Sequence, residues 1–235
     1  MKYNTRKAMA NIKHALNKIQ KEYYGNPLYL INERDAQSMI YAELFRIFNK
    51  PRRVRVHEFK DKKWVEISEH GIKTVPLHAE LYQNHREGKV YTKWKGRFVD
   101  LGIILNYESL IITKKYKGKG NRTSFYGKPD WYPENAIGIE IKFNDWCFKE
   151  TREKQNGKWQ HFCDMVEKDL SKLNDYKRGI FVLVDREGVF SSNSNWWRFV
   201  YDLIPKSKSN RRYQTIRAYC LSPLSHKVYS YGTTD

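Results

Sequence analysis

The chain has few cysteines, no long apolar run and no histidine pattern typical of zinc sites. Its three cysteines are far apart, which argues against a disulfide framework and against a CxxC metal site. No apolar run approaches the ~18 residues that a membrane-spanning helix needs, and the N-terminus lacks the apolar region of a signal peptide. The seven histidines show no HxH or HExxH spacing. We therefore expect a cytoplasmic protein with no membrane partner and no zinc chemistry.

Acidic residues are also scarce relative to basic ones. The chain has 44 Lys and Arg against 26 Asp and Glu, a formal net charge of +18. Such an excess favours a polyanionic partner, above all nucleic acid, although any single basic run is also compatible with a solvated face. Residues 114–128 contain no acid at all. In this segment we predict the following nucleic-acid contacts: Lys114, Lys115, Lys117, Lys119, Arg122 and Lys128.

The length and the hydrophobic pattern indicate an α/β fold. At 235 residues the chain suits one main domain, which we place at residues 30–235, after an N-terminal basic helical extension over residues 1–29. Apolar periodicity and breakers predict helices over residues 5–23, 33–48, 76–87, 159–175 and 194–204. They predict strands over residues 53–59, 63–67, 97–105, 109–113, 137–143, 179–184 and 215–221. This alternation predicts a mixed central β-sheet flanked by helices.

The strand expected over residues 137–143 carries an acid and a base on the same face. Its odd positions are apolar and would face a core, whereas Glu140 and Lys142 share the opposite face. Charged side chains on a largely buried strand are costly unless something uses them. A carboxylate that holds a divalent cation, beside a lysine that contacts a phosphate, is one such use. A surface ion pair on an edge strand is the alternative.

Four further acids are candidates for a core-facing site. Glu33 projects onto the apolar stripe of the helix that Asn32 caps, although an acid in a first helical turn also simply complements the helix dipole. Glu43, on the flank of that stripe, is a second candidate. Asp100 begins the apolar run of the strand expected over residues 97–105, where a structural role as a loop anchor is the alternative. Asp130 competes with Asp100, because it follows Pro129 and precedes the Glu140 strand.

Together these residues resemble the PD-(D/E)xK nuclease superfamily. In that pattern a helix bearing an acid precedes a strand bearing Asp and a strand bearing Glu-x-Lys, and a further helix and strand follow. The segments that carry the resemblance are Asn32-Glu33-Arg34-Asp35-Ala36-Gln37, Arg97-Phe98-Val99-Asp100-Leu101-Gly102-Ile103-Ile104, Ile139-Glu140-Ile141-Lys142 and Lys168-Asp169-Leu170-Ser171-Lys172-Leu173. Val99 stands where the superfamily usually has Pro, and the long interval between Asp100 and Glu140 keeps Asp130 open.

The resemblance implies a restriction-endonuclease-like core and a metal-dependent nuclease. Mg²⁺ or Mn²⁺ would be held by Asp100, Glu140 and the Ile141 carbonyl, and Glu33 would bind a second metal or hold a water. Lys142 would orient the attacking water and offset the developing charge.

The partner and the reaction leave several alternatives open. We expect a DNA endonuclease of restriction, phage or repair type, since its substrate is the polyanion that the charge predicts. An RNA-directed nuclease fits the same charge. A non-catalytic nucleic-acid-binding protein on the same fold is the alternative outside enzymes, with aromatic residues of the basic segment as stacking groups. A homodimer is compatible with each of these functions.

Overall fold

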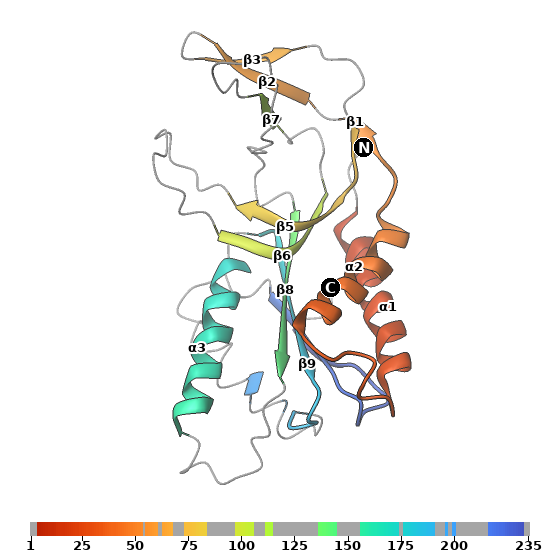
Figure 1. The fold of residues 1–235 in the computed structure, drawn as a ribbon. Coiled ribbons are helices and arrows are strands. Elements are labelled where there is room, and N and C mark those ends of the chain that lie inside the picture. The colour runs from red at the N-terminus through yellow and green to blue at the C-terminus, as the bar shows by residue number, and fades with distance from the viewer. Residues whose placement is uncertain are drawn as a thin grey trace.

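The described residues of the computed structural model include three long helices. They are α1 (Thr5–Tyr23), α2 (Glu33–Ile47) and α3 (Asn156–Leu173) (Figure 1). The side chain of Asn4 caps α1, and that of Asn32 caps α2 by accepting a hydrogen bond from the Asp35 N–H at 3.0 Å. The structure describes residues 4–53, 55–60, 63–67, 73–83, 97–105, 111–114, 136–144, 156–173, 176–190, 196, 199–200 and 216–232.

A six-stranded mixed sheet forms the centre of the described part of the chain. Its order is β11-β10-β9-β8-β6-β5. The strands are β5 (Leu77–Gln83), β6 (Arg97–Ile104), β8 (Ala136–Asn144), β9 (Arg178–Asp185), β10 (Ile216–Leu221) and β11 (Tyr229–Tyr231). β6 runs antiparallel to both β5 and β8, whereas β9 lies parallel to β8 and to β10. The mixed sheet that we predicted is therefore confirmed, together with the helices that flank it.

Helices cover both faces of this sheet. α1 and α2 lie against one face and α3 against the other (Figure 1). The apolar residues of β9 alternate between the two cores: Val182 packs with α1 and α2, and Phe181 packs with α3. The buried stripe of α1 belongs to the same core as α2, and this shared core joins the predicted extension over residues 1–29 to the sheet.

One predicted helix is wrong. The segment 76–87 contains Ala, Glu, Leu and Gln, which favour a helix, but residues 77–83 form the strand β5. Leu77 of β5 pairs with Ile103 of β6 in an antiparallel register, so β5 supplies backbone partners to an edge that β6 would otherwise leave open. Tertiary pairing overrides the local preference here.

Smaller elements lie outside the central sheet. β2 (Arg55–Lys60) and β3 (Lys63–Ile67) form the predicted charged hairpin, and β7 (Ile111–Lys114) pairs parallel to β2. β1 (Arg52–Arg53) pairs with β4 (Lys73–Thr74). Across the described ranges, the chain holds no helix with the length and apolar character that a membrane crossing requires.

Candidate functional site

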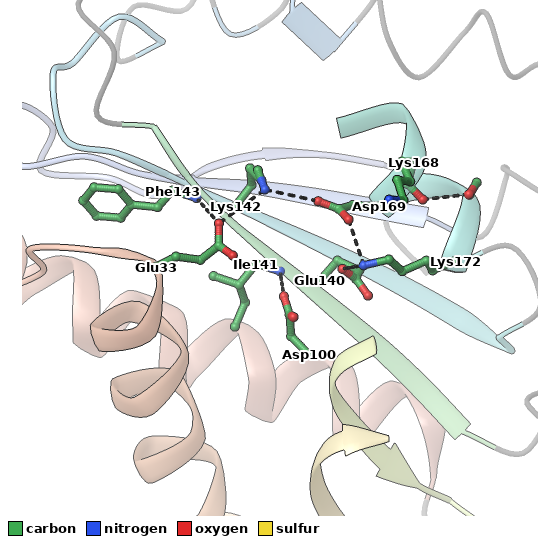
Figure 2. A network of polar contacts seen from close by, with 10 residues as sticks. Glu33, Asp100, Glu140, Ile141, Lys142, Phe143, Lys168, Asp169 and Lys172 are labelled. Atoms are coloured by element: carbon green, nitrogen blue, oxygen red, sulfur yellow. Dashed lines mark hydrogen bonds and ion pairs between the residues drawn. The ribbon is translucent and has the colours of Figure 1, made fainter. Parts of the chain in front are cut away.

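The site forms where β6 stops pairing with β8. Their ladder runs from Ile104 opposite Ala136 to Leu101 opposite Ile139, whereas β9 stays paired with β8 as far as Asn144. Two carboxylates take the place of β6 beyond that point. Asp100 Oδ2 accepts a hydrogen bond from the Ile141 N–H at 2.7 Å, and Glu33 Oε2 accepts one from the Phe143 N–H at 3.4 Å (Figure 2).

The local sequence explains how Glu33 reaches the sheet. Asn32 starts α2 by capping it, so Glu33 is the first helical residue, and the buried Ala36 and Ile40 turn the same helix face toward the sheet. Its carboxylate contacts β8 and also lies 3.4 Å from Lys142 Nζ. The expected orientation of Glu33 toward the sheet is therefore confirmed.

Glu140 is the most deeply buried acid of the site. Its side chain is 1% exposed, and its Oε1 atom has no hydrogen-bond partner within the part of the chain that the structure describes. Burial raises the pKa of Glu140 to about 9, and the nearby Asp100 carboxylate adds to this rise. Burial also raises the pKa of Asp100, against the effect of the Ile141 hydrogen bond. Two neighbouring carboxyl groups, one buried and one half-buried, that disfavour each other's charge either keep a proton or are neutralised by a cation.

Two residues of α3 complete the charge pattern. Lys172 Nζ lies 2.8 Å from Glu140 Oε2 and 2.8 Å from Asp169 Oδ1 (Figure 2). Burial alone would lower the pKa of Lys172, but the Glu140 and Asp169 carboxylates raise it above its ordinary value. Lys172 therefore remains a cation in a largely buried position.

Asp169 joins the two lysines of the site. Its Oδ2 atom lies 3.7 Å from Lys142 Nζ, while its Oδ1 atom binds Lys172. We call the whole group the acid–lysine cluster: Glu33, Asp100, Glu140, Lys142, Asp169 and Lys172. When all are ionised, four carboxylates face two ammonium groups, and the formal charge of −2 equals the charge that one divalent cation neutralises.

Sequence reasoning did not select Asp169 and Lys172 as site residues. A signal for Asp169 was present, because it lies on the flank of the apolar stripe formed by Val166, Leu170 and Leu173. A charged residue on such a flank looks the same whether it faces solvent or a neighbouring strand. Only the packing of α3 against β8 brings Asp169 and Lys172 to Glu140.

The other candidates do not all meet in the acid–lysine cluster. Glu43 instead bonds Lys18 at 2.8 Å and contacts Arg46, so it ties α2 to α1. Of the predicted nucleic-acid contacts, Lys114 ends β7, and the structure describes its backbone only. The remaining candidates lie outside the described residues: Lys115, Lys117, Lys119, Arg122, Lys128 and Asp130.

The donor atoms suit a hard divalent cation. Within the described residues, no group of three or more His, Cys, Asp or Glu side chains is gathered as a ready-made metal cage. Mg²⁺ commonly uses one or two carboxylates and keeps several waters, so Asp100 and Glu140 suffice. The Ile141 carbonyl is a further oxygen on this side, because the N–H and C=O of one strand residue point the same way and that N–H faces Asp100. The Glu140 Oε1 atom, for which the described ranges offer no hydrogen-bond partner, supports this fit.

No family model, curated protein or solved structure matches this chain.

Proposed function

We propose that this protein is a metal-dependent nuclease that hydrolyses phosphodiester bonds, with DNA as the expected substrate and Mg²⁺ or Mn²⁺ as the cation. The observation that carries the proposal is the burial of Glu140 beside Asp100, with one carboxylate oxygen that has no partner among the described residues. A purely binding protein gains nothing from a buried and a half-buried acid that repel a phosphate. A hydrolase can use them to hold a cation against it.

The order of the elements supports the PD-(D/E)xK resemblance. α2 carries Glu33, β6 carries Asp100 and β8 carries Glu140 and Lys142; α3 and the parallel strand β9 follow. The net charge of +18 supports a polyanionic substrate.

The residues divide the chemistry between them. When bound, a divalent cation polarises the phosphoryl oxygens and makes a water molecule more acidic. Asp100 and Glu140 would hold it, with the Ile141 carbonyl as an additional ligand. Lys142 lies at the Glu33 side of the site, where it can orient the attacking water and offset the charge that develops on the phosphate. Glu33 fixes Lys142 and accepts from β8, which limits the movement of both groups.

The direct test is incubation of the purified chain with supercoiled plasmid, linear duplex, single-stranded DNA and RNA. Each substrate is combined with Mg²⁺, Mn²⁺ or EDTA, and the ends of any products are mapped. We expect cleavage of DNA with either cation and none in EDTA. Glu140→Gln should lose at least about a hundredfold in rate, because it keeps the shape and removes the charge. Glu43→Gln, the same change outside the site, should retain cleavage. Cleavage in EDTA, or full activity of Glu140→Gln, would refute the proposal.

A further inference from the structure

Lys172 occupies a place that a cation would compete for. Its ammonium nitrogen lies 2.8 Å from Glu140 Oε2, and its side chain is 20% exposed. In the free protein this ammonium group is the hydrogen-bond partner of Glu140 Oε2. A divalent cation bound at Glu140 and Asp100 would repel the ammonium group beside it, because two like charges at contact distance in a poorly solvated site interact strongly.

Asp169 determines where the displaced ammonium group can go. It lies one turn before Lys172 on α3 and holds Nζ through Oδ1 at 2.8 Å. Its other oxygen faces Lys142 at 3.7 Å. A Lys172 side chain that leaves Glu140 but stays tethered to Asp169 therefore remains beside Lys142. The flexible four-carbon stem and three donors of a lysine suit such a change of partner.

We propose that Lys172 is a second phosphate-contacting lysine, held against Glu140 in the free protein and transferred to a substrate phosphate when a cation binds. This inference rests on the proposed function, since the phosphate is that of the nucleic acid. It predicts that cation binding and nucleic-acid binding favour each other through Lys172, and by linkage the coupling must be equal in both directions.

The test compares Lys172→Gln with the wild-type chain in nucleic-acid binding. The dissociation constant of a fluorescent duplex is measured in Ca²⁺ and in EDTA, and a gel checks that the duplex stays intact. We expect Lys172→Gln to weaken binding about tenfold in Ca²⁺, the size of one charge-assisted contact, and less than about twofold in EDTA. Lys172→Arg should restore the contact. Lys168→Gln, an exposed position one turn earlier on α3, should show no difference between the two media.

A second readout is calorimetric titration of Ca²⁺ with and without the duplex. The duplex should raise the Ca²⁺ affinity of the wild-type chain more than that of Lys172→Gln. If Lys172→Gln does not fold, Asp169→Asn replaces it, because it removes the tether and leaves the Lys172–Glu140 pair. Asp169→Asn should show the same loss of duplex affinity in Ca²⁺ and no such loss in EDTA.

The outcomes separate this inference from the proposed function. Equal weakening by Lys172→Gln in Ca²⁺ and EDTA, or no weakening in Ca²⁺, overturns the transfer of Lys172 while the nuclease proposal stands. A wild-type chain that binds neither Ca²⁺ nor nucleic acid overturns both.

Discussion

The Asp100 carboxylate accepts a hydrogen bond from the backbone N–H of Ile141 at 2.7 Å, at the position where the ladder between β6 and β8 has ended. The Asp100 side chain of β6 thus replaces the β6 backbone as the hydrogen-bond acceptor for an N–H group of β8. This bond uses Oδ2 and fixes the carboxylate beside Glu140, so at least part of the proposed site is preorganised before any cation arrives.

Substitutions at the three central residues should slow cleavage strongly without unfolding the chain. Asp100→Ala, Glu140→Ala and Lys142→Ala should each lower the cleavage rate by about a hundredfold or more, because each removes one contact to the cation or to the developing charge. The measurement is single-turnover cleavage, with circular dichroism to check folding. Asp130→Ala decides between the two candidate aspartates: an inactive Asp130→Ala beside an active Asp100→Ala would transfer the metal role to Asp130.

Stability of the cation-free protein should fall as pH rises above 6. The folded-state pKa of Glu140 is about 9, above its usual 4.5. Between these two pH values the folded state therefore binds more protons than the unfolded state. The free energy of unfolding therefore decreases as pH rises toward 9, with an expected loss of up to about 4 kcal/mol between pH 6 and pH 9. Asp185, whose pKa burial raises to about 6, contributes with the same sign at lower pH.

Denaturant unfolding in EDTA from pH 6 to 9 measures this slope. Glu140→Gln should flatten it, because an amide has no proton to lose, whereas Glu43→Gln should leave it unchanged. Excess Mg²⁺ should stabilise the protein more at the alkaline end than at the acidic end, since it binds the ionised carboxylate. A slope that survives in Glu140→Gln would assign the titration to another group.

Gly138 should be intolerant of a side chain. A Cβ atom at this position would lie 2.8 Å from the Tyr176 ring, inside the core between β8 and α3. Gly138→Ala should lower the free energy of unfolding by about 1–3 kcal/mol, the usual cost of overpacking. Gly157→Ala is the matched control, because nothing lies within 4 Å of its Cβ and it sits in the first turn of α3. Equal melting temperatures for the two variants would show that the ring moves aside without cost.

The basic segment 114–128 should hold nucleic acid through its charge rather than by reading bases. Replacing Lys114, Lys115, Lys117 and Lys119 by Ala should weaken binding to unrelated duplexes alike. It should also reduce the salt slope by up to ~0.9 for each lost contact in a log–log plot.

A variant with four lysines of α1 replaced by Ala removes the same net charge elsewhere: Lys7, Lys13, Lys18 and Lys21. Fluorescence anisotropy over a range of salt concentrations compares the two variants. If the α1 variant reduces the salt slope as much, the effect belongs to net charge and not to the segment.

The sequence by itself determined the local structure and the polarity of its surfaces. Asn32 and the spacing of Ala36, Ile40 and Leu44 predicted α2 and turned Glu33 toward the sheet. The alternation in residues 137–143 placed Glu140 and Lys142 together on one face. These features follow from the side-chain period of 3.6 residues in a helix and of 2 residues in a strand. Both periods are visible within a short segment of sequence.

Only the tertiary structure decided which distant side chains meet. No local pattern indicates that the register of β6 against β8 ends at Leu101 and Ile139 and so frees Ile141 to bond Asp100. The same holds for Lys172, which local pattern cannot distinguish from a solvated lysine until α3 packs on β8, and for residues 77–83, which pair with β6 against their helical preference. Register and packing depend on the summed burial of many residues from remote segments, and that sum has no short-range signature in the sequence.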